Sequence, residues 1–281
     1  MGTLILIGGG TTPGSPAIEA FVRLAGAKDG ASIVGLTTAS SEVPIARERW
    51  LADLAAAGAT SCVIPLVESR EQAYDPAIVK QVREARGIFL GGGDQVKLVS
   101  ALSGTPLEAA LRDAYIDGAI VCGTSAGAAA LTKTTLAGNE VDDDGKLVEQ
   151  YIGPGLGLLG YHTLIDTHFT QRRRLYRLFV AVAEFPALMG LGIDEDTALV
   201  VQREIGVVVG RGGVTFVDGS SVRYNNATDV THGPELTISA LRVGIIGTGQ
   251  RFNLKKRELE AVLSPPAVEQ VKNRVTSERS V

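Results

Sequence analysis

The chain has 281 residues, of which 45% are hydrophobic and 21% charged, and its formal net charge is −4. This balance excludes intrinsic disorder, and a sequence pI near 5.5 argues against nucleic-acid binding through bulk charge. Two cysteines and three histidines make neither a disulfide framework nor a good zinc set, so we expect no metal and no other cofactor. No apolar run approaches the ~20 residues of a membrane helix, and the run at 4–7 does not resemble a secretory signal. We therefore expect a cytoplasmic protein without a membrane partner.

Short apolar runs alternate with helical patterns over the first 135 residues. Unbroken apolar strands separated by helices predict a mostly parallel sheet with helices on both faces. The carboxyl ends of such strands are where sites gather, and glycine-rich turns follow three of the runs, at 8–10, 91–95 and 123–127. The runs lie at 3–7, 32–36, 61–65, 87–90 and 119–122.

The second half has a different pattern. We expect an exposed loop from Asp142, a turn-rich connection at 153–160, a strand over Tyr161–His168 and a helix over Arg172–Glu184. Strand-like runs from Leu188 to about Ile246 predict an antiparallel extension of the sheet. We interpret residues 1–281 as a single domain with a parallel α/β half (1–135), a strand-rich half (136–265) and a polar tail (266–281). A helix is expected before Pro265.

The strongest local signal is Gly123-Thr124-Ser125-Ala126-Gly127, which follows an apolar run and precedes a run of small residues. Gly-x-Ser-x-Gly between a strand and a helix is typical of a nucleophile elbow, in which a sharp turn exposes the serine hydroxyl. The backbone N–H of Ala126 would then be one oxyanion donor. The alternative is an ordinary glycine-rich turn between a strand and a helix.

A serine nucleophile needs a base, and the candidates are His162, His168 and His232. His162 and His168 share one predicted strand and one of its faces. His168 is favoured because Asp166 lies on the same face and an arginine run follows. A carboxylate from Asp194, Glu195 or Asp196 could orient the imidazole.

Three consecutive arginines, 172–174, fall in the first turn of the predicted helix, where they oppose the helix dipole at about 0.3–1 kcal/mol each. An anionic substrate would compensate for this cost. A helical wheel places Arg172 and Arg174 beside the apolar face, whereas Arg173 and Arg177 point away from it. The alternative is a solvated basic surface.

Two further glycine runs could serve a site. The loop Gly91-Gly92-Gly93-Asp94-Gln95 could supply the second oxyanion donor. Gly8-Gly9-Gly10 invites a dinucleotide-binding interpretation. We reject it because Pro13 stands where the third glycine belongs and the second strand lacks an acidic residue at its end.

Taken together, these residues resemble the cyanophycinase family of serine peptidases, which is related to aspartyl dipeptidases with a class I glutamine-amidotransferase-like (flavodoxin-like) fold. Four blocks carry the resemblance in the order of the family: Gly92-Gly93-Asp94-Gln95, Gly123-Thr124-Ser125-Ala126-Gly127-Ala128, Asp166-Thr167-His168-Phe169 with Arg172, Arg174 and Arg177, and Gly192-Ile193-Asp194-Glu195-Asp196-Thr197-Ala198.

The resemblance implies a Ser–His–Glu mechanism with Ser125 as nucleophile, His168 as general base and Glu195 as its orienting group. It implies oxyanion donors at Gly93 and Ala126. The residues implied around the substrate are Gln95, Asp166, Thr167, Arg172, Arg174 and Arg177. For Arg177 we follow the resemblance rather than the helical wheel.

The implied activity is exopeptidase hydrolysis of an aspartyl peptide through an acyl-enzyme. The expected substrate is cyanophycin, a poly-aspartate whose side chains carry arginine, and the products are β-Asp-Arg dipeptides. The resemblance also implies a homodimer. The sequence departs from the family at Thr167, where cyanophycin-degrading members usually have glutamine, so substrate contacts on that side must differ.

Three alternatives stay open. One is an aspartyl dipeptidase that acts on short peptides. A second is an α/β-hydrolase-type esterase that uses Ser125, His232 and an acid within 194–196, which is the chain order of such enzymes. The third is a non-catalytic scaffold that binds an anion through the arginines.

Overall fold

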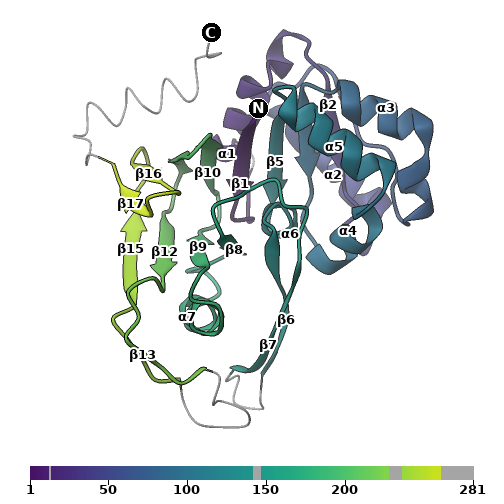
Figure 1. The fold of residues 1–281 in the computed structure, drawn as a ribbon. Helices are drawn as coiled ribbons and strands as arrows, with labels where there is room; N and C mark the ends of the chain where they lie inside the picture. Colours follow the sequence, from purple (N-terminus) through teal and green to yellow (C-terminus); the bar gives the residue numbers. More distant parts are fainter. Residues whose placement is uncertain (13, 142–146, 228–235, 261–281) are drawn as a thin grey trace.

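The computed structural model describes residues 1–12, 14–141, 147–227 and 236–260. Its largest element is a nine-stranded sheet in the order β17-β16-β11-β10-β1-β5-β4-β2-β3 (Figure 1). Neighbours from β1 to β3 in this order pair in parallel. These strands are β1 (Thr3–Ile7), β2 (Ile33–Leu36), β3 (Cys62–Val63), β4 (Gly87–Leu90) and β5 (Ile120–Thr124).

Four antiparallel strands extend this sheet beyond β1. They come from the second half of the chain, as the sequence predicted for an antiparallel extension. The predicted α/β class with a mostly parallel sheet in the first half is therefore confirmed. The four strands are β10 (Thr197–Gln202), β11 (Ile205–Gly210), β16 (Arg251–Asn253) and β17 (Glu258–Leu259).

Helices cover both faces of the parallel strands because the buried side chains alternate. Leu4 and Leu6 of β1 belong to one core cluster with α3, α4 and α5, whereas Ile5 and Ile7 belong to another with α1 and α2. Proline in the first turn starts α1, α2, α3 and α5. The helices are α1 (Pro16–Leu24), α2 (Val43–Ala56), α3 (Pro76–Glu84), α4 (Gln95–Leu102), α5 (Pro106–Ile116), α6 (Ala126–Ala129) and α7 (Leu175–Glu184), with short 3₁₀ turns at Ala27–Asp29 and Glu71–Tyr74.

A second, four-stranded sheet has the order β15-β12-β9-β8 and is formed by β8 (Thr163–Thr167), β9 (Met189–Ile193), β12 (Val214–Asp218) and β15 (Arg242–Ile246). Its strands β8 and β9 are parallel, which the expected antiparallel extension did not include. α7 packs on this sheet through Leu178 and Val182, while Ile165 and Leu191 belong to the large core cluster. The two sheets thus share a core, and a single domain over 1–281 stays a prediction.

Several local expectations were wrong. A long hairpin, β6 (Thr134–Val141) and β7 (Leu147–Pro154), was not predicted. β7 includes only the first two residues of the connection expected at 153–160. The cross-strand pairing that forms the hairpin is invisible to a pattern search along one strand. A small hairpin of β13 (Tyr224–Asn225) and β14 (Ile238–Ser239) lies within the expected extension.

The strand and the helix on either side of the arginine run also have other bounds than predicted. His162 and His168 both have a φ of about +50°, so they lie just outside β8 at its two ends, and the same-face argument fails. α7 begins at Leu175 rather than at Arg172. β16 and β17 occupy part of the region in which a helix was expected before Pro265. Pro265 and Pro266, the loop at Asp142–Asp144 and the tail 266–281 lie outside the described residues. In the part of the chain that the structure covers, no helix is long and apolar enough to cross a bilayer.

Candidate active site

Ser125 lies in the sharp turn between β5 and α6. Its φ of 51° and ψ of −117° are unusual for a residue with a side chain, and its backbone N–H is held by the carbonyl of Ile7 at 2.9 Å. The flanking glycines make this turn sterically feasible. A Cβ at Gly123 would lie 2.4 Å from the Gly127 carbonyl oxygen, and a Cβ at Gly127 would lie 2.2 Å from the Leu90 oxygen. This is the geometry of a nucleophile elbow.

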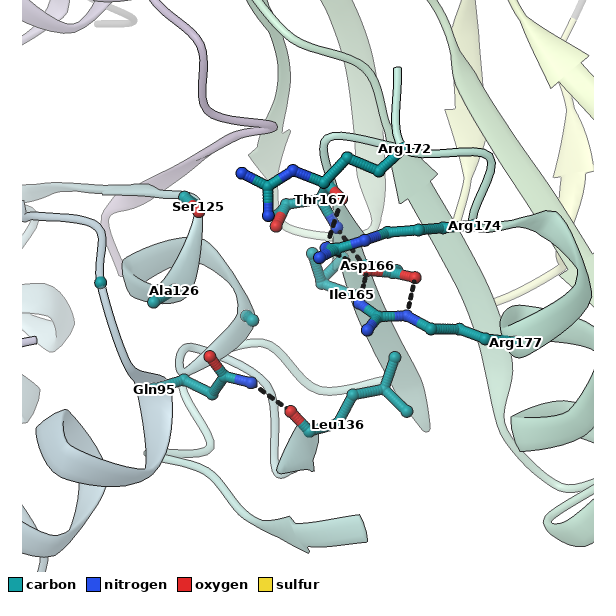
Figure 2. A pocket seen from close by; sticks show the side chains of 12 residues that line it. Gln95, Ser125, Ala126, Leu136, Ile165, Asp166, Thr167, Arg172, Arg174 and Arg177 are labelled. Atoms are coloured by element: carbon teal, nitrogen blue, oxygen red, sulfur yellow. Dashed lines mark hydrogen bonds and ion pairs between the residues drawn. The ribbon is translucent and has the colours of Figure 1, made fainter. Parts of the chain in front are cut away.

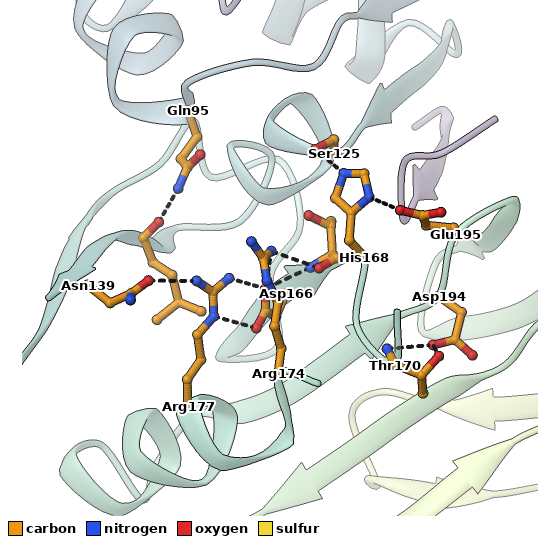
Figure 3. A network of polar contacts seen from close by, with 12 residues as sticks. Gln95, Ser125, Asn139, Asp166, His168, Thr170, Arg174, Arg177, Asp194 and Glu195 are labelled. Atoms are coloured by element: carbon orange, nitrogen blue, oxygen red, sulfur yellow. Dashed lines mark hydrogen bonds and ion pairs between the residues drawn. The ribbon is translucent and has the colours of Figure 1, made fainter. Parts of the chain in front are cut away.

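His168 connects Ser125 to Glu195. Its Nε2 lies 2.8 Å from the Ser125 Oγ, and its Nδ1 lies 2.6 Å from the Glu195 Oε1 (Figure 3). His168 follows β8 and Glu195 follows β9, so two parallel neighbours deliver both groups to one edge. The carboxylate can only accept, which assigns the proton to Nδ1 and leaves Nε2 to accept from the serine hydroxyl.

The surroundings of His168 keep its imidazole neutral. Burial lowers the pKa of His168 below the ordinary value of 6.5, and the positive charges of Arg172 and Arg174 act in the same direction. The hydrogen bond and the charge of Glu195 oppose this shift without cancelling it. A neutral imidazole at neutral pH is the form that can accept a proton from Ser125.

The three acidic residues at the end of β9 have different partners. Asp194 accepts hydrogen bonds from the Thr170 backbone and hydroxyl and from the Gly213 N–H. Asp196 forms an ion pair with Arg211 at 3.1 Å. Only Glu195 of the three contacts the imidazole, and its own N–H donates to the Gln171 side chain. The geometry therefore selects Glu195 from the carboxylates that sequence reasoning left open.

The predicted oxyanion donors Gly93 and Ala126 lie beside Ser125 in the lining of one cavity. The Ala126 N–H belongs to the first turn of α6, where backbone N–H groups have no intrahelical partner. Gly93 has a φ of +140°, and its Cα faces the Ala39 carbonyl so closely that a Cβ would lie 2.1 Å from that oxygen. The Asp94 N–H donates to the same carbonyl, which fixes this loop.

This cavity has a volume of about 100 Å³ and opens beside Ser125 (Figure 2). It brings together every residue that the sequence placed around the substrate. Three lining residues that we had not expected are Ala129 from α6, Leu136 from β6 and Ile165 from β8. The complete lining is Gly93, Gln95, Ser125, Ala126, Ala129, Leu136, Ile165, Asp166, Thr167, Arg172, Arg174 and Arg177.

Asp166 is the centre of the charge network in the cavity wall. Its side chain is 1% exposed and accepts from Arg174 Nη1 at 3.1 Å, from Arg177 Nε at 2.8 Å and from Arg177 Nη2. The Thr167 N–H donates to the same carboxylate at 2.8 Å. Two cations and one backbone donor thus satisfy this buried anion.

The three arginines differ in how much hydrogen-bonding capacity they retain. Arg177 is held by Asp166 and by the Asn139 Oδ1, which lies 3.0 Å from its Nη1. Arg174 uses its Nη1 on Asp166 and on the Thr167 carbonyl. The backbone N–H of Arg172 donates to the His168 carbonyl at 2.9 Å, but its guanidinium has neither a hydrogen bond nor an ion pair with any described residue. Figure 2 shows this guanidinium on the Ser125 side of the cavity.

The predicted wheel was wrong for this segment. Arg172 and Arg173 precede α7, and Arg174 is its N-terminal flanking residue, so the wheel was started about one turn too early. Arg177, which the wheel had point away from the apolar face, lines the cavity. The cost that we assigned to cations in a first helical turn does not apply to Arg172 and Arg173. Arg177 lies in the first turn of α7 and Arg174 directly before it, and the buried Asp166 compensates for both.

Sequence reasoning missed the contribution of the β6–β7 hairpin, and it placed the glycine run 8–10 at the edge where sites gather without predicting its contacts. Asn139 and Leu136 come from the unexpected hairpin, and the Leu136 carbonyl accepts from Gln95 Nε2. The glycine run 8–10, which we had rejected as a nucleotide motif, lies against His168 and Glu195. The signal for it was a third glycine run at the carboxyl end of a neighbouring parallel strand.

The remaining candidates lie elsewhere. His162 is at the opposite end of β8 and is exposed, and His232 is outside the described residues. Burial raises the pKa of the Cys62 thiol to about 11 and that of Cys122 well above its ordinary value, so both are thiols at neutral pH. Among the residues that the structure places, no group of three histidine, cysteine or acidic side chains could hold a metal ion.

A serine, a histidine and a carboxylate in one hydrogen-bonded line, at the carboxyl edge of an open α/β sheet, are the arrangement that serine hydrolases use. The model of peptidase family S51 matches residues 4–208 of this chain. The chain therefore belongs to this family and is a serine peptidase, as the resemblance to the cyanophycinase family implied.

Curated relatives support the same assignment. A cyanophycinase from Geminocystis herdmanii is 33% identical over 260 residues, which cover 91% of this chain and 95% of the relative. A cyanophycinase from Nostoc sp. is 34% identical over 260 residues, covering 91% and 87%. The crystal structure of a peptidase from an acI-B1 actinobacterium has the same fold, with a TM-score of 0.68, 22% identity and coverage of 90% and 97%.

Proposed function

We propose that this serine peptidase is a cyanophycinase-like exopeptidase that hydrolyses aspartyl-containing peptides, with cyanophycin as the preferred substrate and β-Asp-Arg as the product. The observation that carries the proposal is the Ser125–His168–Glu195 line of hydrogen bonds beside a cationic cavity. The identity to cyanophycinases over most of the chain supports this substrate class.

The proposed mechanism follows from the assigned protons. As the Ser125 hydroxyl attacks the scissile carbonyl, its proton passes to His168 Nε2, and Glu195 stabilises the imidazolium. The N–H groups of Gly93 and Ala126 bind the oxyanion. His168 then protonates the leaving amine, and water hydrolyses the acyl-enzyme by the same route.

The charge of the cavity favours an acidic substrate. Three guanidinium groups face one carboxylate, and that carboxylate is fully used by Arg174 and Arg177. The Arg172 guanidinium has no ion pair with a described residue and lies on the Ser125 side of the cavity in Figure 2, so we assign to it the paired hydrogen bonds to a substrate carboxylate. Arg174 retains its Nε and Nη2 donors for the same purpose.

Short aspartyl peptides are the second candidate substrate. The cavity measures about 100 Å³, and Asp166, its one acidic lining residue, is already paired with arginines. No described lining residue therefore offers a free carboxylate to the arginine side chain of cyanophycin. Thr167 also lacks the amide that the resemblance leads us to expect there. We keep a homodimer and a cytoplasmic location as further proposals.

The test is incubation of the purified protein with insoluble cyanophycin, with soluble products followed by mass spectrometry. We expect β-Asp-Arg from the wild type, and a loss of about 10⁶-fold for Ser125→Ala. Arg203→Ala serves as a matched surface control, because Arg203 lies in the β10–β11 turn, far along the sheet from Ser125. Release of short β-aspartyl dipeptides without attack on the polymer would instead favour the second candidate, and residual activity in Ser125→Ala would exclude the mechanism.

A further inference from the structure

The loop after β1, Gly8-Gly9-Gly10, contacts both segments that carry the acid–base pair. The His168 N–H donates to the Gly8 carbonyl at 2.7 Å, and the Asp196 N–H donates to the Gly9 carbonyl at 2.9 Å. The Gly8 N–H donates to the Thr197 carbonyl at 3.0 Å. The loop thus joins the end of β8 to the segment between β9 and β10, and His168 and Glu195 come from these two places.

Two of these glycines also face the functional side chains directly. A Cβ on Gly9 would lie 2.4 Å from both Cε1 and Nε2 of His168. A Cβ on Gly10 would lie 2.4 Å from the Glu195 carboxyl carbon and 2.5 Å from its Oε2. These separations are much shorter than carbon–carbon or carbon–oxygen van der Waals contact, so only a hydrogen atom fits at either position.

We propose that Gly9 and Gly10 are positioning residues: Gly9 sets the place of the His168 imidazole, and Gly10 sets the place of the Glu195 carboxylate. The inference rests on the proposed function, because it assumes that these two side chains carry the acid–base chemistry. Reacting groups displaced by about 1 Å lose on the order of 10²-fold in rate, so contacts this close matter for catalysis.

The two glycines should differ in how a methyl group is tolerated. His168 is only 9% exposed, and its backbone N–H donates to the Gly8 carbonyl, so its ring has little room to move. Glu195 is a flexible side chain that is 35% exposed, and it can rotate toward solvent. Gly10→Ala should therefore fold and expel the carboxylate, and so behave as a variant without Glu195.

Gly14 provides a matched control on the same loop. Gly9, Gly10 and Gly14 have φ values of +86°, +59° and +76°, so alanine bears a left-handed backbone penalty at each of them. A Cβ at Gly14 would meet nothing within 4 Å. Any difference between Gly10→Ala and Gly14→Ala beyond this shared penalty reports the contact with Glu195.

The experiment measures the labelling rate of Ser125 by a fluorophosphonate, a small neutral reagent that does not need the arginines, with thermal melting of each variant. We expect Gly10→Ala to be labelled at least 10²-fold more slowly than the wild type, and Gly14→Ala within about threefold of it. Equal rates for Gly10→Ala and Gly14→Ala would overturn the proposal.

A double-mutant cycle separates positioning from general damage to the fold. If Gly10→Ala acts by displacing Glu195, combining it with Glu195→Ala should slow labelling no further than Glu195→Ala alone. If the losses in labelling rate of Gly10→Ala and Glu195→Ala multiply in the double variant, the positioning role is refuted. If Ser125→Ala is still labelled by the fluorophosphonate, the proposed function is refuted instead. The cycle decides the role of Gly10, and a Gly9→Ala variant that folds and is labelled as fast as Gly14→Ala would overturn the role of Gly9.

Discussion

The two sides of the candidate active site are built differently. Ser125 is held by one five-residue block on a central strand, and the flanking glycines that shape its turn are two residues away. His168 and Glu195 are 27 residues apart and come from two strands of the other sheet. The comparison teaches that the nucleophile depends on local backbone geometry, whereas the acid–base pair depends on contacts between distant segments.

The largest expected effect tests the acid–base side. His168→Ala should lower kcat/KM by about 10⁶-fold, as much as Ser125→Ala, because it removes the proton acceptor and leaves only binding and the oxyanion donors. The measurement is initial-rate kinetics on the peptide that proves to be the substrate. His162→Ala and His232→Ala are the controls and should remain near wild-type activity. Loss of activity in His232→Ala with retention in His168→Ala would restore the esterase interpretation.

The same difference explains what the sequence could predict. The elbow and the alternation of β1, β2, β4 and β5 with helices are local patterns, and both were predicted. The residues alone left Glu195, Asp194 and Asp196 open, and only the family resemblance chose Glu195, because the choice depends on which carboxylate faces an imidazole from another segment. That information lies in the packing of two sheets.

The predictions that were wrong in the second half of the chain have a common physical cause. The hairpin β6–β7 forms by pairing between its strands, in which Asn139 lies opposite Gln150, and a helical or strand period along one segment does not reveal such pairing. α7 begins three residues later than predicted because Arg173 has a φ of +52°, which an α-helix cannot include, and Arg174 and Arg177 on the far side of this turn pair with Asp166. Tertiary contacts there override the local apolar spacing.

The intermediate effect tests the nucleophile side through stability. Gly127→Ala places a Cβ 2.2 Å from the Leu90 oxygen and should lower the free energy of unfolding by about 3 kcal/mol, the upper end for overpacking. Gly160→Ala is the matched control, because a Cβ there meets nothing within 4 Å, and it should change stability by less than about 0.5 kcal/mol. Urea unfolding followed by circular dichroism measures both. Equal effects would show that the elbow is less tightly constrained than its geometry indicates.

The smallest effect concerns the pH at which His168 becomes a base. Burial and the charge of Arg172 hold the pKa of His168 below 6.5, so the imidazole is neutral and reactivity reaches its plateau already below the usual histidine range. Arg172→Gln removes a repelling cation, which favours the imidazolium and raises this pKa. The acidic limb of the fluorophosphonate labelling rate should therefore move to higher pH, with little change in the plateau. Arg172→Lys keeps the charge and should leave the limb close to its wild-type position.

Proton NMR of the histidine Cε1–H resonances provides a second readout, since the chain has only three histidines. A limb that is unmoved in Arg172→Gln would mean that burial and Arg174 lower the pKa of His168 without a contribution from Arg172, which would then act on the substrate and not on the base.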